Sequence, residues 1–440
     1  MKVVYVGDNR NRGNFGCRAT STALSQIIER NNIIVGTITG RYTNNDTGEL
    51  FFYKYLPAGV YKWLGKKKRW SQLKSAFYLF IRLIRLGRQY IFSNFDYLCE
   101  DNIEESLSNF IKCLPANPQL NEFDLRNYDF DALIVNGEGS FIFRVPAWRE
   151  SVNELMLMYW ALKMGKKVYY MNGMLSDDPF TKRNDAFIKV AKPIFENAEI
   201  LGVREDYSLK YANEQFPNAN IKEFPDALFT WYDMINDGFK VPNGKYVMGM
   251  TGASNSSFTK YDFTKPYILV SGSSSIGKAT NDIEEAISIY SKLVEEIRNS
   301  FQQKVFLIEV CEGDSFLRTV GERTKTDVIA IDTPILAAAK ILANADVYIS
   351  GRYHPAILAS QGGTPCVFMS SNSHKTISLQ ELLNYKKVHE YYVLPSDTEI
   401  QEMISDAKDA ISQGQSLRED IKQRAAVLSR LANQMEEIIK

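Results

Sequence analysis

The chain has 440 residues, of which 45% are apolar and 24% charged, a composition typical of a soluble globular protein with room for two domains. Lysine plus arginine and aspartate plus glutamate each number 52, so the net charge is +0, which argues against nucleic-acid binding through overall charge. The five cysteines are scattered and form no C-x-x-C pair, which argues against a zinc knuckle or a disulfide framework and fits a reducing cytosol.

Short apolar strands alternate with helical patterns along the whole chain. The predicted strands are 3–6, 33–39, 132–136, 167–171, 200–204 and 222–224 in the first half, and 267–271, 304–310, 327–331, 347–350, 366–369 and 391–394 in the second. Continuous apolar runs separated by helices indicate parallel strands covered on both faces. We therefore predict an α/β fold with two Rossmann-like, doubly wound domains.

Consecutive turn signals place the domain boundary near residues 233–245. The first predicted domain spans 1–240, with a helical insertion at about 50–120, and the second spans 241–400. Residues 401–440 carry apolar side chains at helical spacing, which predicts a C-terminal helix packed on one domain. The first residues form a strand and lack the apolar stretch of a signal peptide, so we expect a cytoplasmic protein.

The loop after the first strand contains Gly13-Asn14-Phe15-Gly16 and precedes a predicted helix at 19–29. Glycines let the backbone approach a ligand closely, and a helix N-terminus offers free N–H groups to an anion. Asn14 and Gly16 are therefore candidates for binding phosphate or the acceptor. A tight strand-to-helix turn without a ligand explains the pattern equally well.

One segment, residues 61–92, breaks the alternation of strands and helices. It holds nine Lys or Arg residues and no Asp or Glu, with aromatic residues interleaved. A basic, aromatic-rich amphipathic helix is the pattern of an interfacial helix on an anionic membrane surface. The other interpretation is a helical insertion whose apolar face packs on the first domain and whose cations are solvated.

Two further strand ends of the first domain carry polar side chains. Asn136-Gly137-Glu138-Gly139-Ser140 suggests a glycine-rich turn in which Glu138 accepts sugar hydroxyls, with a purely structural turn as the alternative. Arg204 follows the strand at 200–204 and places a guanidinium at the same edge of the sheet. The adjacent acids, Glu205 and Asp206, either neutralise Arg204 or begin the next helix.

The second domain opens with Gly272-Ser273-Ser274-Ser275-Ile276-Gly277-Lys278, which matches the spacing of a P-loop. Ala279 stands where the Mg²⁺-binding Ser or Thr of a P-loop belongs, which argues against an NTPase. We interpret the segment as a serine-rich turn whose Ser273 and Ser274 hydroxyls face an anion in the interdomain cleft.

The most informative motif is Gly351-Arg352-Tyr353-His354, between the strand at 347–350 and a helix with Pro355 in its first turn. The carboxyl ends of parallel strands are where open α/β folds bind ligands. Arg352 supplies an anion-binding guanidinium and His354 a proton-transfer group. Lys375 follows the next strand and adds a cation. No His pair has metal-ligand spacing, so we expect no metal.

Taken in order, these motifs resemble the polysaccharide pyruvyl transferase family. The matching segments are Gly13–Gly16, Ala132–Ser140, Val203–Ser208, Pro225–Ala227 and Arg352–His354 followed by Gly363-Thr364-Pro365 and Lys375. Two departures stand out: Cys17 replaces the acid that usually follows Gly-Asn-x-Gly, and the basic segment 61–92 is not a family hallmark.

The resemblance implies a glycosyltransferase-like (GT-B-like) pair of domains with the active site in the cleft. It also implies phosphoenolpyruvate as the donor and a sugar of a surface polysaccharide, free or lipid-linked, as the acceptor. Arg204 and Arg352, with Tyr353 and Lys375, would hold the phosphate and carboxylate of the donor. His354 would act as the general acid or base, and no metal or redox cofactor is demanded.

Two other functions stay open at this point. A glycosyltransferase of the same fold would use a nucleotide sugar, with Arg352 and Lys375 stabilising the leaving diphosphate. A sugar-binding protein without activity is the alternative outside the enzymes.

Overall fold

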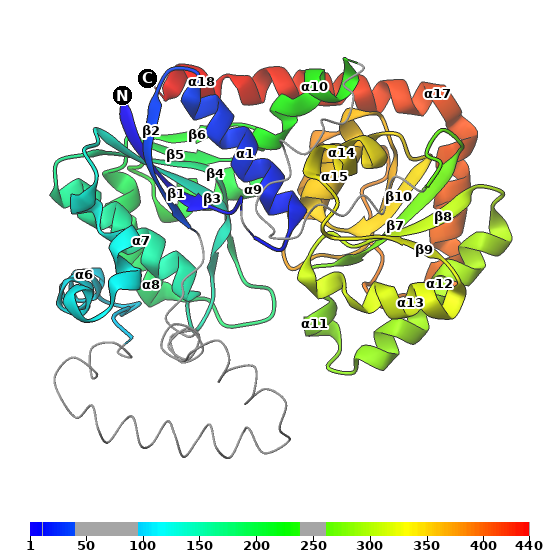
Figure 1. Ribbon diagram of the computed structural model, residues 1–440, viewed down its shortest axis with the longest axis horizontal. Coiled ribbons are helices and arrows are strands. Elements are labelled where there is room, and N and C mark those ends of the chain that lie inside the picture. Colours follow the sequence, from blue (N-terminus) through cyan, green and yellow to red (C-terminus); the bar gives the residue numbers. More distant parts are fainter. Residues whose placement is uncertain (11, 40–95, 238–260, 440) are drawn as a thin grey trace, which may run out of the picture.

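The computed structural model describes residues 1–439 except residue 11 and residues 40–95 and 238–260. The basic aromatic segment 61–92 and part of the expected domain boundary therefore lie outside the described residues. Two sheets, each with helices packed against it, lie side by side (Figure 1). The predicted α/β class with two doubly wound parallel-sheet domains is confirmed.

The first domain contains a six-stranded parallel sheet in the order β2-β1-β3-β4-β5-β6. Its strands are β1 (Lys2–Asp8), β2 (Ile33–Thr39), β3 (Ala132–Phe143), β4 (Lys167–Asp177), β5 (Ile200–Val203) and β6 (Ile221–Glu223). The helices that carry or support the site are α1 (Phe15–Glu29), α6 (Ile103–Cys113), α7 (Arg149–Lys163), α8 (Asp185–Glu196), α9 (Asp206–Gln215), η5 (Ala227–Trp231) and α10 (Tyr232–Asn236).

The second domain contains a five-stranded parallel sheet in the order β11-β10-β7-β8-β9. Its strands are β7 (Tyr267–Ser273), β8 (Lys304–Ile308), β9 (Asp327–Ile329), β10 (Val347–Gly351) and β11 (Cys366–Phe368). Its helices are α11 (Ile276–Ala279), α12 (Ile283–Ser300), α13 (Phe316–Thr324), α14 (Ile335–Ala343), α15 (Tyr353–Gln361), α16 (Lys375–Leu382), α17 (Asp397–Asn433) and α18 (Met435–Ile438).

The strand orders create one topological switch point in each sheet. In the first sheet the chain leaves β1 toward β2 on one side, whereas β3 lies on the other side. In the second sheet β7 continues to β8 on one side, whereas β10 lies on the other. Loops diverge at such a point and leave a crevice at the carboxyl ends of the strands. The motifs after β1, β3, β7 and β10 therefore start at the two crevices.

The glycine-rich turn predicted at 136–140 is wrong, because β3 continues through it to Phe143. The glycines make room for an aromatic ring: a Cβ on Gly137 would lie 2.2 Å from Cζ of Tyr170, and one on Gly173 of β4 would lie 2.0 Å from Cε1 of that ring. The regular pairing of β3 with β4 is interrupted at Glu138. The backbone φ of Glu138 is 36°, a value that residues other than glycine rarely adopt. This irregularity turns the strand locally rather than ending it.

Other boundaries also differ from the predictions. The strand predicted at 391–394 is wrong, since only Tyr391 forms an isolated bridge, to Met369. Helix α1 begins at Phe15 rather than residue 19, because Asn14 caps it by accepting a hydrogen bond from the N–H of Cys17.

The C-terminal helix packs on both domains rather than on one. Helix α17 starts at Asp397 on the second domain, kinks at Gly414 and then runs along η5 of the first domain (Figure 1). Beyond it, Arg30 at the end of α1 forms a 2.9 Å ion pair with Glu436 of α18. The side chain of Asn32 donates a 2.7 Å hydrogen bond to the carbonyl of Ile439.

A continuous apolar core joins the two domains. One buried cluster includes Phe15 and Ala19 of α1, Ile335 of α14 and Leu428 of α17. The N-terminus of α1 is thereby fixed against the second domain, which positions the two walls of the cleft. Among the described residues, no helix combines the length and apolar character needed to cross a membrane.

Candidate active site

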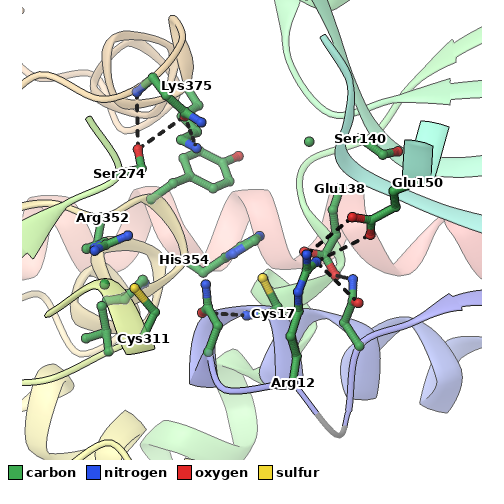
Figure 2. A pocket seen from close by; sticks show the side chains of 18 of the residues that line it. Arg12, Cys17, Glu138, Ser140, Glu150, Ser274, Cys311, Arg352, His354 and Lys375 are labelled. Atoms are coloured by element: carbon green, nitrogen blue, oxygen red, sulfur yellow. Dashed lines mark hydrogen bonds and ion pairs between the residues drawn. The ribbon is translucent and has the colours of Figure 1, made fainter. Parts of the chain in front are cut away.

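A cavity of about 430 Å³ lies between the domains, at the carboxyl edges of both sheets. Most of the residues singled out from the sequence line it: Asn14, Glu138, Arg204, Ser274, Arg352, Tyr353, His354 and Lys375. Gly16 and Ser273 are not among the lining residues. The motifs of two sheets, more than 300 residues apart in the chain, therefore meet in one place (Figure 2).

His354 stands in the first turn of α15, with Arg352 as the residue before the helix. Its Nε2 atom lies 3.3 Å from Oδ2 of Asp226 and 3.3 Å from a terminal nitrogen of Arg204. Asp226 is fully buried and also accepts a 2.9 Å hydrogen bond from Arg204. Burial would raise the pKa of the Asp226 carboxyl, but His354, Arg204 and a backbone N–H together hold it below its ordinary value. Asp226 is thus a fixed negative charge that orients the imidazole.

Gly16 leaves the space that His354 occupies. A Cβ at this position would lie 2.8 Å from Cβ of His354 and 3.3 Å from its Nδ1. Asn14 shapes the same corner as the cap of α1, its side chain accepting a 3.1 Å hydrogen bond from the backbone of Cys17. These two residues position the site and the helix N-terminus; whether they also contact a ligand stays a prediction.

Arg352 points into the cavity from the end of β10 (Figure 2). One terminal nitrogen donates to the buried Asp314, and its Nε atom has no hydrogen-bond partner among the described residues. Burial would lower the pKa of the guanidinium, but the charges of Asp314 and other neighbours raise it above its ordinary value. Arg352 is therefore a permanent cation in the lining of the cavity.

Arg204 and Tyr353 form a stacked pair beside Arg352. The guanidinium of Arg204 lies 4.5 Å from the centre of the Tyr353 ring, and only 2% of the arginine is exposed. The sequence left open whether Glu205 or Asp206 neutralises this arginine; instead Asp226 pairs with it, and Glu205 caps α9. This stacking explains why an aromatic residue stands between Arg352 and His354.

Lys375 completes the cationic side of the cavity from the start of α16. Burial, together with the positive charges of Arg204 and Arg352, lowers the pKa of its ammonium to about 7. Its Nζ atom donates a 2.6 Å hydrogen bond to the side chain of Asn372, which also accepts one from Ser274. An anion bound beside these three cations would relieve their mutual repulsion.

The serine-rich segment after β7 is not a P-loop. Gly272 and Ser273 still belong to β7, and a Cβ on Gly272 would lie 2.3 Å from a carboxylate oxygen of Asp314. The Ser273 hydroxyl donates to the carbonyl of Ser370 rather than facing the cavity. Lys278 reaches across to the first domain and lies 3.4 Å from Asp178.

Main-chain hydrogen bonds tie the two walls together at the base of the cavity. The N–H of Phe15 donates to the carbonyl of Val310 at 3.0 Å, and the N–H of Glu312 donates to the carbonyl of Gly13 at 3.0 Å. A further contact joins Nε2 of His374 to Glu205 at 3.0 Å. The loop after β1 is thus held against the loop after β8.

Cys17, where the family usually has an acid, lies close to the carboxylate of Glu138. The acid expected after Gly-Asn-x-Gly is missing at Cys17, yet donor atoms of Cys17, Glu138 and His354 all lie within 4.8 Å of one another. These three could hold a metal ion by distance alone. Burial, and then the charge of Glu138, raise the pKa of the Cys17 thiol well above its ordinary value, so the thiolate that a metal prefers is disfavoured. The expectation of a metal-free site stays a prediction.

Sequence reasoning missed five polar or aromatic residues of the site, namely Arg12, Trp148, Glu150, Glu154 and Asp226. All but Asp226 line the cavity. Glu150 and Glu154 stand one turn apart on α7, a spacing that marks a shared face. Asp226 belongs to the Pro225–Ala227 segment that carries part of the family resemblance. No feature of the neighbouring sequence indicates that its carboxylate contacts His354.

The comparisons with known proteins agree with this geometry. The model of the polysaccharide pyruvyl transferase family matches residues 14–373. No curated protein matches the chain in sequence.

Solved structures share the two-domain arrangement at low sequence identity. UDP-GlcNAc 2-epimerase from Neisseria meningitidis bound to UDP-GlcNAc is similar with a TM-score of 0.51 and 10% identity, covering 98% of this chain and 99% of that chain. The Rickettsia bellii UDP-N-acetylglucosamine 2-epimerase gives a TM-score of 0.50 and 11% identity over 100% and 96% of the two chains. Arabidopsis thaliana UGT89C1 complexed with UDP-L-rhamnose gives 0.53 and 10% over 100% and 98%. These likenesses show the GT-B-like fold.

Proposed function

The chain belongs to the polysaccharide pyruvyl transferase family and is therefore a transferase, and we propose that it uses phosphoenolpyruvate to build a pyruvyl ketal on a sugar of a cell-surface polysaccharide. The acceptor is either the polymer or its lipid-linked precursor. Membership of the family sets aside the interpretation of a sugar-binding protein without activity.

The observation that carries the proposal is the cationic side of the cavity. Arg204, Arg352 and Lys375 converge beside His354, and all three line the cavity. Phosphoenolpyruvate carries a phosphate and a carboxylate on three carbons, so it needs several cations within a small volume. The Arg204 guanidinium lies 4.5 Å from the centre of the Tyr353 ring.

The proposed reaction begins with protonation of the donor. His354, oriented by Asp226, gives a proton to the methylene carbon, which leaves a cationic centre at the carbon that bears the phosphate. A sugar hydroxyl forms a bond to this carbon, and Glu138 takes the hydroxyl proton. The bond to the phosphate oxygen then breaks, and the phosphate departs with the proton from Glu138.

A second hydroxyl of the same sugar closes the ketal. It attacks the same carbon, and its proton returns to His354, which restores the starting state. One donor and one diol thus yield one ketal and one hydrogen phosphate, so atoms and charges balance. The reaction as written requires neither a metal nor a redox cofactor.

A glycosyltransferase is the second candidate, favoured by the fold. Structures of two GT-B-like neighbours contain UDP-GlcNAc and UDP-L-rhamnose, respectively. In that case Arg352 and Lys375 would stabilise a leaving diphosphate. The family match favours the pyruvyl donor over a nucleotide sugar.

Donor choice is directly testable. Thermal shift with phosphoenolpyruvate, UDP-glucose and UDP-N-acetylglucosamine compares binding, and phosphate release with oligosaccharide acceptors compares turnover. We expect stabilisation by phosphoenolpyruvate and release of phosphate. Transfer of sugar from a nucleotide sugar, with no phosphate released from phosphoenolpyruvate, would show that the proposed donor is wrong.

We also propose that residues 61–92 bring the enzyme to the inner face of the cell membrane, where lipid-linked acceptors reside. The basis is the sequence pattern alone, nine cations with interleaved aromatic residues, because this segment lies outside the described residues. Each cation near an anionic surface contributes about 1 kcal/mol.

Sedimentation with anionic liposomes tests this location. Replacing Lys66, Lys67, Lys68 and Arg69 by Gln should reduce the bound fraction and leave activity on a small soluble acceptor nearly unchanged. If the parent protein ignores anionic liposomes at low salt, the segment is not a membrane anchor.

A further inference from the structure

Carboxylates line the wall of the cavity opposite the cations. Glu138 comes from β3, and Glu150 and Glu154 come from α7, so all three belong to the first domain. Figure 2 shows Glu138 and Glu150 on the side of His354 away from Arg352. A cavity with one cationic and one acidic end can hold two different ligands, an anion at one end and a hydrogen-bond donor at the other.

Glu138 is held rigidly as an acceptor. Its Oε1 atom accepts hydrogen bonds from Asn9 at 2.8 Å, Asn136 at 3.1 Å and Ser21 at 3.2 Å, and only 7% of the residue is exposed. Three donors on one oxygen fix the direction of the carboxyl group.

Glu154, in contrast to the acceptor Glu138, is a candidate hydrogen-bond donor. It is 2% exposed and accepts a 2.7 Å hydrogen bond from the hydroxyl of Ser140. Burial, and then the charge of Glu150, raise the pKa of this carboxyl well above its ordinary value. A shift in this direction favours the protonated form of the carboxyl group, which can donate its O–H to a ligand oxygen.

Arg12 is the cation of this wall, and Glu150 neutralises it. Its two terminal nitrogens lie 3.4 Å and 3.2 Å from the two carboxylate oxygens of Glu150. Trp148 lines the cavity two residues before Glu150 and is half-buried, so it offers an apolar face beside the polar groups.

We propose that this wall is the acceptor subsite and that it selects a sugar residue without a carboxylate: a neutral hexose or hexosamine with two free hydroxyls, and not a uronic acid. The inference rests on the proposed function. Sugar hydroxyls donate to Glu138 and Glu150 and accept from Glu154, and Trp148 covers one face of the ring. A uronate at the same place would put a third negative charge beside Glu138 and Glu150 in a partly enclosed site, where like charges repel strongly.

Glu150 controls the preference for neutral sugars over uronates, because it pairs with Arg12. In Glu150→Gln the side chain keeps its size and loses its charge, so Arg12 is released to bind a carboxylate. We therefore expect the variant to lose preference for the neutral sugar and to gain affinity for the uronate. A role of Glu150 in folding alone would change neither preference.

The test measures acceptor binding without donor, so it is independent of donor identity. Ligand-detected NMR titrates methyl β-D-galactoside and methyl β-D-glucoside against methyl β-D-galacturonide and methyl β-D-glucuronide, which differ from them only at C6. We expect at least one neutral glycoside to bind about tenfold or more tightly than its uronide, since one like-charge contact costs more than about 1.4 kcal/mol. Glu150→Gln should reverse or abolish the difference, and Glu154→Gln should weaken the neutral glycoside.

A matched control is Glu214→Gln, an exposed carboxylate on α9 outside the cavity, which should bind as the parent does. The assignment is overturned if no neutral glycoside binds, if the uronides bind equally well, or if the Glu150→Gln and Glu154→Gln variants bind as the parent does. Thermal-shift titration with phosphoenolpyruvate measures donor affinity on the same proteins. The affinity of both variants should stay within about twofold of that of the parent. If the parent protein does not bind phosphoenolpyruvate, the proposed function is wrong. The glycoside titrations then decide on the acceptor subsite by themselves.

Discussion

The Nε2 atom of His354 lies 3.3 Å from Oδ2 of Asp226, although 128 residues separate them in the chain (354 − 226). The carboxylate is fully buried and ionised, and it reaches His354 from the first domain while the histidine belongs to the second. The proton-transfer group of the site therefore depends on the domain interface for its orientation. Asp226 is a positioning residue because it acts through His354.

The first prediction concerns this pair. Asp226→Asn keeps the size of the side chain and removes its charge, so it should lower kcat roughly 10- to 100-fold, the cost of one hydrogen bond between charged groups. A fall in thermal stability with an unchanged kcat of the folded enzyme would instead assign Asp226 to structure alone.

The second prediction separates proton transfer from donor binding. His354→Ala should lower kcat about 10²- to 10⁴-fold and leave the Kd of phosphoenolpyruvate nearly unchanged. Arg352→Ala should raise that Kd about 10- to 100-fold, because it removes a charge-assisted hydrogen bond. Calorimetric titration of both variants measures the two effects, and an equal loss of binding in both would reject the division of roles.

The third prediction follows from Lys375, whose pKa is lowered to about 7 by burial and by Arg204 and Arg352. Its positive charge is present below this pH and is lost as the pH rises through it. Donor affinity should therefore fall above pH 7, by up to about tenfold per pH unit if only the charged form binds. Lys375→Arg keeps its charge at every pH of interest and should bind with a flatter profile. Identical profiles in parent and variant would show that Lys375 does not contact the donor.

The sequence predicts a site residue well when a strand end places it in the site, and poorly when the packing of a helix does so. Arg352 and His354 closely follow a strand end, and Lys375 follows the loop after the next strand. Parallel strands bring such ends to one edge, so their convergence was predictable. Glu150 and Glu154, two of the residues missed, lie on a helix behind β3, and only the packing of α7 brings them to the cavity.

Two glycine patterns show what the sequence leaves open. Gly16 was expected to let the backbone approach a ligand closely, and in the structure the neighbouring group is the His354 side chain of the other domain. Gly137 was expected to end a strand, but it makes room for the Tyr170 ring while β3 continues. Both patterns look the same in sequence, because what fills the missing Cβ volume is decided by tertiary packing.

The fourth prediction uses Gly16. Alanine in a helix is ordinarily about 1 kcal/mol more favourable than glycine, so Gly16→Ala would stabilise an unconstrained helix. Here the new methyl group would lie 2.8 Å from Cβ of His354 and must displace it. We expect a fall in kcat of roughly tenfold or more from misplacement of the acid, with a much smaller effect on donor Kd. Gly277→Ala is the control, since no atom lies within 4 Å of its added Cβ, and should match the parent.

The last prediction concerns the stability that α18 gives to the first domain. Met435 is fully buried and belongs to the apolar cluster that includes α1 and α15, although it stands after the long helix that starts on the second domain. Met435→Ala should lower the free energy of unfolding by about 2–5 kcal/mol, because it removes buried methylene groups and leaves a cavity. Glu437→Ala, two residues further and exposed, should change it by less than about 0.5 kcal/mol. Because α1 carries Asn14 and Gly16 at its other end, a loosened α18 should also make the site more sensitive to heat. Activity lost at the same temperature in both variants would show that α18 does not support α1.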